Sequence, residues 1–442
     1  FIWLRRQLSP RQQNDIMQLG LPGIGFRTEN RRFYPAGATT SYIVGMTNRD
    51  NQGISGLEKY IDDQGLADLQ ASGLADPDSL KPFKLSVDLR VQHIVRDEAL
   101  QAMTRFHAIA AGAVVINVKT GEVVAMASVP DFDPNNPVDA QDKDKLNRMS
   151  AGLYEMGSTI KSFTTAMALD SGKVNLNSTF DARHPITIGR RTIRDFHGKN
   201  RILTVPEVFI YSSNIGTARM ALALGVDYHR AFLKKMGQLD RLRTEIPESA
   251  EPLVPKRWAE LNTVTIAFGH GLSVAPLQAV MGISALMNGG KLIPPTFLKR
   301  TEAEAAQLGK QVVKPETSER MRYLMRLNAE KGSAKKVDIP GYYAGGKTGT
   351  AEKVINGHYS KTKLLTTFMA VLPADQPKYL VTIILDEPQP TPETHGYATS
   401  GWNAAPTAGQ VVERIAPMLG ITPRFNLPTA DKQILQATAG IR

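Results

Sequence analysis

Residues 341–350 read GYYAGGKTGT, and this stretch fits two motifs that belong to different folds. Gly341 to Thr348 matches G-x-x-x-x-G-K-[ST], a loop that cradles nucleotide phosphates on its backbone N–H groups. Lys347 to Thr350 matches K-T-G-T, a strand motif that accompanies an S-x-x-K nucleophile in one group of serine enzymes. The sequence around the stretch decides between the two.

The flanking residues argue against a phosphate loop. Such a loop follows an apolar strand and opens a helix, whose free N–H groups bind the phosphates. Residues 331–340, KGSAKKVDIP, are charged and end in proline, and the turn pair Asn356-Gly357 leaves no room for a helix downstream. The run YLVTIILDE (379–387) resembles a magnesium-binding strand of nucleotide-binding proteins. A nucleotide site therefore stays as the minor alternative.

The serine-enzyme interpretation requires S-x-x-K, then S-x-N, then K-[ST]-G along the chain. Ser158 and Lys161 supply the first motif, since they follow a glycine and open the apolar helical run EMGSTIKSFTTAMALDSG. About one or two S-x-x-K matches are expected by chance in a chain of this length. The two other matches lie in polar, glycine-bordered stretches that we interpret as loops: Ser333/Lys336 and Ser360/Lys363.

The second and third motifs follow in the required order. Ser212 and Asn214 form the S-x-N motif, in the helix-flanked stretch FIYSSNIGTARMAL. K-T-G also occurs at 119–121, but there it lies between two β-rich runs, AGAVVINV and EVVAMASV, and predicts a hairpin turn. The order and context of the three motifs favour a serine enzyme.

The chemistry assigns a role to each motif. A serine hydroxyl is a weak nucleophile, so Ser158 needs a base, and a lysine acts as one only when it is neutral. Burial and a neighbouring cation both lower a lysine pKa, so Lys161 with Lys347 close by is suited to that role. Ser212 would relay a proton to the departing amine, and the Asn214 amide would hold the amide of the substrate.

The strand motif is predicted to bind substrate. Lys347 with the hydroxyls of Thr348 and Thr350, on either side of Gly349, forms a positive, hydrogen-bonding end of the cleft that suits a carboxylate. The backbone N–H groups of Ser158 and Thr350 would form the oxyanion hole.

The order of predicted elements indicates an α+β fold. Residues 111–129 and 345–388 contain runs that read as strands, residues 155–330 are rich in helical patterns, and residues 401–419 read as a closing helix. This order predicts an antiparallel sheet built from both ends of the segment and flanked by helices, with an all-helical subdomain. We divide the chain into a small amino-terminal domain (1–84), a catalytic domain (85–422) and a carboxyl-terminal tail (423–442).

Composition narrows the choice of function. The 442 residues carry a formal charge of +11, which favours anionic partners. The chain has no cysteine and its eight histidines form no metal motif, so we expect neither thiol chemistry, nor a metal, nor a cofactor. It has no run of eighteen apolar residues, and because it begins at Phe1 without Met, we expect a trimmed chain whose membrane anchor lies upstream.

These residues resemble the class B penicillin-binding proteins, the peptidoglycan transpeptidases. The resemblance covers nearly the whole chain: ENRRFYPAG (29–37) and GISGLEKYIDD (53–63) are similar to the amino-terminal pedestal of that class, and LSVDLRVQ, FGHGLSVAPLQ (268–278) and the three motifs to its catalytic domain. The Ser-Ser-Asn second motif is similar to the septum-building, cell-division branch.

The resemblance implies a serine D,D-transpeptidase. Ser158 would attack the D-Ala-D-Ala donor of a stem peptide, release the last D-Ala and pass the acyl group to an amine of a neighbouring peptide, and β-lactam antibiotics would mimic the donor. It also implies a single-pass inner-membrane protein with its catalytic domain in the periplasm. Its partners would be a division-complex glycosyltransferase and scaffold proteins, with no role for nucleic acid.

Two related activities fit the sequence less well. A class A β-lactamase carries a glutamate in E-x-E-L-N to hydrolyse its acyl-enzyme, but here Trp258 stands in that place, in W-A-E-L-N (258–262). A β-lactam sensor needs a signalling module, and the sequence shows no trace of one. A bifunctional glycan polymerase needs a second enzyme domain, and fewer than ninety residues precede the catalytic domain.

Overall fold

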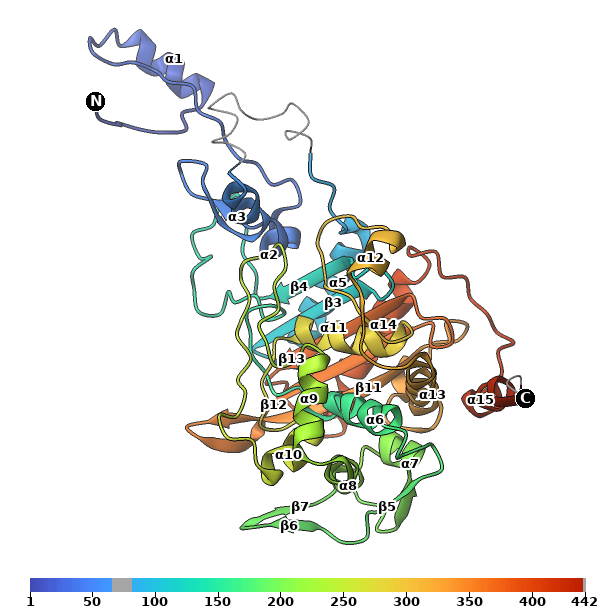
Figure 1. Cartoon of the computed structure of the whole chain (residues 1–442). Helices are drawn as coiled ribbons and strands as arrows, with labels where there is room; N and C mark the ends of the chain where they lie inside the picture. Colours follow the sequence, from blue (N-terminus) through green and yellow to red (C-terminus); the bar gives the residue numbers. More distant parts are fainter. Residues whose placement is uncertain (66–81, 440–442) are drawn as a thin grey trace.

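The computed structural model describes residues 1–65 and 82–439 (Figure 1). Its centre is a five-stranded antiparallel sheet in the order β11-β12-β13-β3-β4, so the strands come from both ends of the catalytic segment. The predicted α+β fold is confirmed. The strands are β3 (Ala110–Asn117), β4 (Val123–Val129), β11 (Gly345–Ile355), β12 (His358–Leu372) and β13 (Tyr379–Asp386).

Helices cover both faces of this sheet. The side chains of β3 alternate, with Ala113 and Val115 in the core beneath α5 (Leu89–Arg105) and α14 (Ala404–Ile415). Val114 and Ile116 belong to the opposite core, with residues of α6 (Lys161–Asp170), α11 (Pro276–Met287) and α13 (Pro315–Lys331). Burial on both faces explains why β3 and β4 read as nearly continuous apolar runs.

The segment between β4 and β11 supplies most of the helices, and many of them gather below the sheet in Figure 1, but the segment is not all-helical as predicted. The remaining helices there are η3 (Gly157–Ile160), α7 (Val205–Ile210), α8 (Asn214–Leu224), α9 (Val226–Lys235), α10 (Glu260–Ala267), α12 (Glu302–Leu308) and η4 (Lys335–Val337). Short strands that the sequence did not predict also occur: β5 (Thr179–Asp181), β6 (Ile186–Ile188), β7 (Arg191–Ile193), β8 (Ile202–Thr204), β9 (Lys291–Leu292) and β10 (Lys310–Gln311). Runs of two or three residues are too short to show an alternating pattern.

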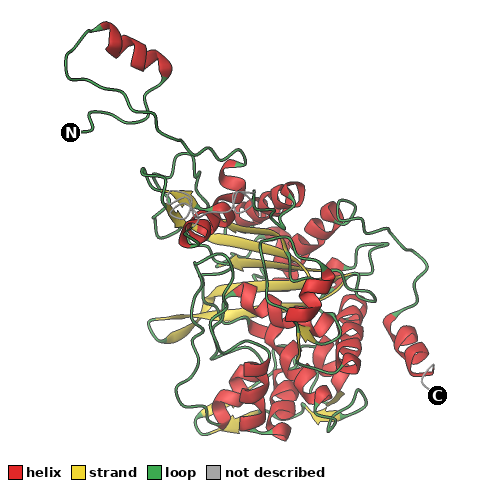
Figure 2. Ribbon diagram, turned by 45° about the horizontal axis from the view of Figure 1, so that its top comes forward, coloured by secondary structure: helices red, strands yellow, loops and turns green. Residues whose placement is uncertain are grey.

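The amino-terminal residues form small elements, and Figure 2 shows α1 standing apart from the sheet. They are α1 (Pro10–Gln18), η1 (Gly37–Thr40), α2 (Ser41–Val44), β1 (Met46–Thr47), β2 (Gly53–Ser55) and α3 (Gly56–Asp63). Within the described residues, no helix combines the length and the apolar character needed to cross a membrane. Residues 66–81 of the predicted pedestal and 440–442 of the predicted tail lie outside the described residues, and the domain boundaries stay a prediction.

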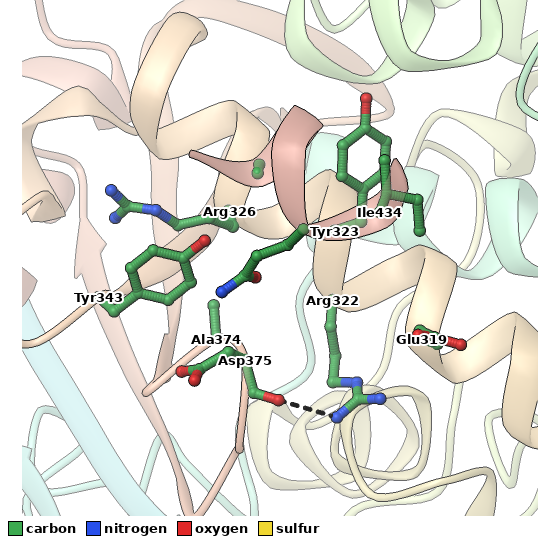
Figure 3. Close-up of a pocket in the computed structure, with 10 residues that line it drawn as sticks. Glu319, Arg322, Tyr323, Arg326, Tyr343, Ala374, Asp375 and Ile434 are labelled. Atoms are coloured by element: carbon green, nitrogen blue, oxygen red, sulfur yellow. Dashed lines mark hydrogen bonds between the residues drawn. The ribbon is translucent and has the colours of Figure 1, made fainter. Parts of the chain in front are cut away.

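The carboxyl-terminal segment is tied to α13. After η5 (Pro392–Thr394), η6 (Ser400–Trp402) and α14, the last described helix is α15 (Ala430–Ala439). Tyr323 of α13 donates to Asp431 at 2.8 Å, and Tyr343 donates to the Pro428 carbonyl at 2.9 Å. Between α13 and α15 lies a cavity of about 80 Å³, where Arg322 donates to the Asp375 carbonyl at 3.1 Å (Figure 3). This segment therefore braces the helix that packs against β11.

Candidate active site

Ser158 lies in η3, directly before α6 and against the free edge of β11. Gly157 has a φ of +55°, and a Cβ on it would lie 2.6 Å from the Thr350 carbonyl oxygen. Behind it, a Cβ on Gly269 would lie 1.9 Å from the Gly157 carbonyl oxygen. Only glycine fits such approaches without displacing backbone. The two glycines thus bring the first motif into contact with the strand of the third.

The two motif lysines meet at one hydroxyl. The Nζ atoms of Lys161 and Lys347 both lie 3.0 Å from the Ser212 Oγ, and Lys161 also donates to the Ser212 carbonyl oxygen at 2.6 Å. Both lysines are almost fully buried, with 1% and 0% of their surface exposed. The predicted convergence of these three residues is present in the structure.

Burial is the main cause of the lowered pKa of both lysine amines. It lowers the Lys161 pKa well below the usual lysine value, and the nearby Lys347 charge lowers it further, while Asp195 opposes the change. Burial alone lowers the Lys347 pKa to about 7. Two full charges this close repel one another, so a neutral Lys161 beside a positive Lys347 is the favoured arrangement. A neutral amine keeps a lone pair that can accept a proton.

The second motif turns sharply between α7 and α8. Ser212 has a φ of +55°, which places its hydroxyl between the lysines. Ser213 caps α8 by accepting from the Gly216 N–H at 2.9 Å. The Asn214 Nδ2 donates to the Arg194 carbonyl oxygen at 3.1 Å.

Asp195 braces this turn, and the sequence did not reveal it. Its carboxylate accepts from the Ser213 hydroxyl at 2.7 Å and from the Ile215 N–H at 2.9 Å. It lies in a loop between β7 and β8, in a stretch dominated by arginine and lysine. The only sequence feature that marked Asp195 was its position as a single acid among basic residues, and this feature indicates a surface ion pair equally well.

The third motif lies on β11, which excludes the phosphate-loop alternative because the lysine is in a strand and not at the start of a helix. The side chain of Thr348 contacts the Ser333 hydroxyl at 2.8 Å, and the Thr350 hydroxyl accepts from the Ser400 N–H at 3.1 Å. Gly349 packs closely on the first motif, since a Cβ there would lie 2.6 Å from the Met156 carbonyl oxygen.

The two other S-x-x-K matches lie in different settings, one in a turn and one in a strand. Ser333, interpreted as a chance match in a loop, does lie in a turn after α13, but this turn reaches the third motif. Ser360 was wrongly interpreted as a loop residue, because it lies in β12 and pairs with Lys353 of β11. The Asn356-Gly357 turn connects the two strands there, and the polar, alternating sequence of this exposed hairpin resembles a loop. The supposed magnesium ligand Asp386 instead pairs with Lys353 at 2.7 Å.

The family-specific model of the penicillin binding protein transpeptidase domain matches residues 111–413. The chain belongs to the penicillin-binding protein transpeptidase family. The predicted family and fold class are confirmed.

This transpeptidase family member also resembles individual proteins over most of its length. It is 39% identical to the "Probable peptidoglycan D,D-transpeptidase FtsI" of Caulobacter vibrioides, over 96% of this chain and 72% of that protein. It is 31% identical to the peptidoglycan D,D-transpeptidase FtsI of Escherichia coli, over 98% of this chain and 74% of that protein. The transpeptidase domain of Burkholderia pseudomallei penicillin-binding protein 3 has a similar structure, with a TM-score of 0.69, 29% identity, and coverage of 78% of this chain and 98% of that one.

Close to the nucleophile in sequence, Glu155 connects two residues that the three motifs do not contain, Tyr359 and Gly271. Glu155, three residues before the nucleophile, accepts from the Tyr359 hydroxyl at 3.0 Å and from the Gly271 N–H at 2.8 Å. Tyr359 stacks on His270, with 5.3 Å between the ring centroids. Burial, with a smaller contribution from nearby Lys161, lowers the His270 pKa to about 4, so the imidazole is neutral at neutral pH.

Among residues 1–65 and 82–439, no group of three or more His, Asp or Glu side chains is arranged to hold a metal ion.

Proposed function

We propose that the chain is a serine D,D-transpeptidase that cross-links peptidoglycan stem peptides during septal wall synthesis. One observation carries the proposal: two buried lysines from distant parts of the chain meet at the Ser212 hydroxyl, beside a serine at the start of a helix. In a chain of this family, that arrangement supports acyl transfer through a serine ester.

Acylation begins with the transfer of the Ser158 hydroxyl proton to neutral Lys161. The Ser158 oxygen attacks the carbonyl carbon between the two D-Ala residues, and the N–H groups of Ser158 and Thr350 stabilise the resulting oxyanion. The C–N bond then breaks, and the departing amine takes a proton that returns from Lys161 through the hydroxyl of Ser212. Lys347, held beside the same hydroxyl, keeps the base neutral by its positive charge.

The substrate is held on both sides of the scissile bond. The hydroxyls of Thr348 and Thr350, together with the charge of Lys347, bind the terminal carboxylate, with Gly349 allowing close approach. The Asn214 amide binds the amide of the stem peptide.

Deacylation uses an amine of a neighbouring stem peptide in place of water. The amine attacks the ester carbonyl, loses a proton to Lys161 and forms the new amide, while the Ser158 oxygen recovers a proton. β-Lactams react by the same first step but lose no fragment that could diffuse away. Trp258 donates to Thr263 at 2.8 Å and offers no carboxylate to activate water, which fits a long-lived penicilloyl ester.

We also propose where the enzyme is located and which proteins it contacts. A single-pass anchor ahead of the amino-terminal module would fix the enzyme to the inner membrane with the catalytic domain in the periplasm. The amino-terminal residues would contact the glycosyltransferase and scaffold proteins of the division complex. Two of the relatives are named FtsI, which supports the septal role.

The experiment is labelling with fluorescent penicillin followed by mass mapping. We expect one adduct, on the peptide that contains Ser158, absent in Ser158→Ala and formed more slowly in Lys347→Ala. ATP binding measured in parallel tests the nucleotide alternative. Tight magnesium-dependent ATP binding without a penicillin adduct would overturn the proposal.

A further inference from the structure

Residues 183–201, the basic hairpin, carry one sign of charge almost exclusively. They contain six arginines and lysines and a single acid, Asp195. The hairpin consists of β6, β7 and the loop to β8. Its cations are Arg183, Arg190, Arg191, Arg194, Lys199 and Arg201.

Most of these cations have no ionic partner. Arg183 pairs with Asp181 and Arg201 pairs with Glu207. The other four, all exposed, form no ion pair within the part of the chain that the structure describes: Arg190, Arg191, Arg194 and Lys199. The one acid is turned inward to brace Ser213 and Ile215 and leaves the outer charge uncompensated. A surface of this kind attracts a polyanion.

Aromatic side chains lie among the charges. Phe196 is 72% exposed, with its ring 4.2 Å from that of His197. The Lys199 ammonium lies 4.9 Å from the ring centre of Tyr211, which limits how far this cation can move. Exposed aromatic groups beside fixed cations suit a ligand that is both charged and partly apolar, as a peptide carrying carboxylates is.

The basic hairpin is continuous with the cleft. The carbonyl of Arg194 holds the Asn214 side chain, and the neighbouring Asp195 holds the turn that carries Ser212. Burial raises the pKa of Tyr359 and the charge of Arg191 opposes this rise, so Arg191 lies within electrostatic reach of the ring that stacks on His270. In Figure 1, β6 and β7 lie at the end of the molecule opposite α1.

We infer that the basic hairpin binds the carboxylates of stem peptides along an uncross-linked glycan strand, outside the bond that reacts. This inference rests on the proposed function. Arginine binds carboxylates through two parallel hydrogen bonds, and a strand that repeats its stem peptides can engage several cations at once. An anionic membrane would satisfy the same charges, but contact with the second motif favours a ligand that also enters the cleft.

The test compares two triple variants with equal loss of charge. R190A/R191A/K199A removes three of the unpaired cations, and K173A/K291A/K310A removes three exposed lysines outside the hairpin. For each protein we would measure four properties: penicillin acylation, turnover of a short soluble thioester analogue of the D-Ala-D-Ala donor, co-sedimentation with uncross-linked glycan strands at two salt concentrations, and binding to anionic lipid vesicles.

We expect the hairpin variant to acylate and to turn over the short substrate at rates within about twofold of the wild type. Its affinity for the strands should fall about tenfold and depend less on salt, since each exposed pair contributes modestly and salt screens it. Strands whose carboxylates are amidated should bind the wild type equally weakly. The control variant should bind the strands as the wild type does.

Two outcomes would overturn the inference: strand binding by the hairpin variant equal to that of the control, or a loss confined to anionic lipid vesicles. Failure of the proposed function is distinguishable, because the wild type would then form no penicillin adduct at Ser158.

Discussion

Replacement of Asp195 by asparagine tests how the second motif is held in place. The carboxylate accepts one hydrogen bond from the Ser213 hydroxyl and one from the Ile215 N–H. Asparagine keeps only one oxygen, and that oxygen is neutral, so one of the two hydrogen bonds loses its acceptor and the other loses the charge of its acceptor. A hydrogen bond to a charged group contributes about 1.5–3 kcal/mol. We expect the free energy of unfolding to fall by about that amount, and by more in Asp195→Ala.

Part of this lost free energy should also appear as a slower acylation step. If the turn that carries Ser212 and Asn214 shifts, the acylation rate constant should fall by up to about 100-fold, since each 1.36 kcal/mol corresponds to a factor of ten. The pH profile separates this effect from electrostatics. Acylation needs neutral Lys161, so the rate rises as pH passes through the Lys161 pKa. Asp195 raises that pKa, so Asp195→Asn should move the rising limb to lower pH.

The assay is stopped-flow acylation by fluorescent penicillin from acidic to alkaline pH, with thermal unfolding measured on the same samples. Asp181→Asn is the matched control, because the Asp181 side chain bonds to Arg183 and makes no contact with the second motif among the described residues. The reasoning is refuted if Asp195→Asn leaves the stability and the plateau rate as in the control, or if its rising limb moves to higher pH.

Three other predictions use the same assays. Lys347→Met removes a charge that lowers the pKa of the catalytic base, so the rising limb of acylation should move to higher pH; an unmoved limb would contradict the assigned coupling. Gly157→Ala should lower the free energy of unfolding by about 1–3 kcal/mol and slow acylation, because the added methyl lies 2.6 Å from the Thr350 carbonyl in a left-handed conformation. Ser333→Ala should slow acylation about two- to tenfold by removing a hydrogen bond to the third motif, whereas Ser360→Ala, on the exposed hairpin, should have no effect; equal rates in the two variants would argue against a role for Ser333.

The sequence allowed the sheet and the motifs to be predicted because their signals are local. The strands β3 and β13 are rich in apolar, β-branched residues. The helix after Ser158 has a helical pattern of apolar residues and is preceded by a glycine. The order of the motifs was enough to predict that Lys161, Ser212 and Lys347 lie together. Spacing along the chain was sufficient there, since each motif carries its own structural context.

The supporting residues could not be predicted in the same way. Asp195 contacts a turn 18 residues further along the chain, Ser333 contacts a strand 15 residues further along, and neither belongs to a periodic segment. Ser333 was set aside because its spacing to a lysine suggested a chance match, while its actual partner is Thr348 on β11. Glu155 preceded the nucleophile in the quoted motif, yet its partners Tyr359 and Gly271 lie more than a hundred residues away. Such pairings depend on tertiary structure and leave no local pattern.

The pairing of β13 with β3 sets the order in which the enzyme can assemble. Tyr379 lies opposite Asn117, so the middle of the sheet cannot close until nearly the whole chain has been synthesised. Closing so long a loop costs entropy before any strand contact is gained, which predicts slow folding of this domain. Ser158 is made early and the strand bearing Lys347 late, so a nascent or shortened chain has a nucleophile without its second lysine. Reactivity toward the cell wall therefore arises only in a finished molecule.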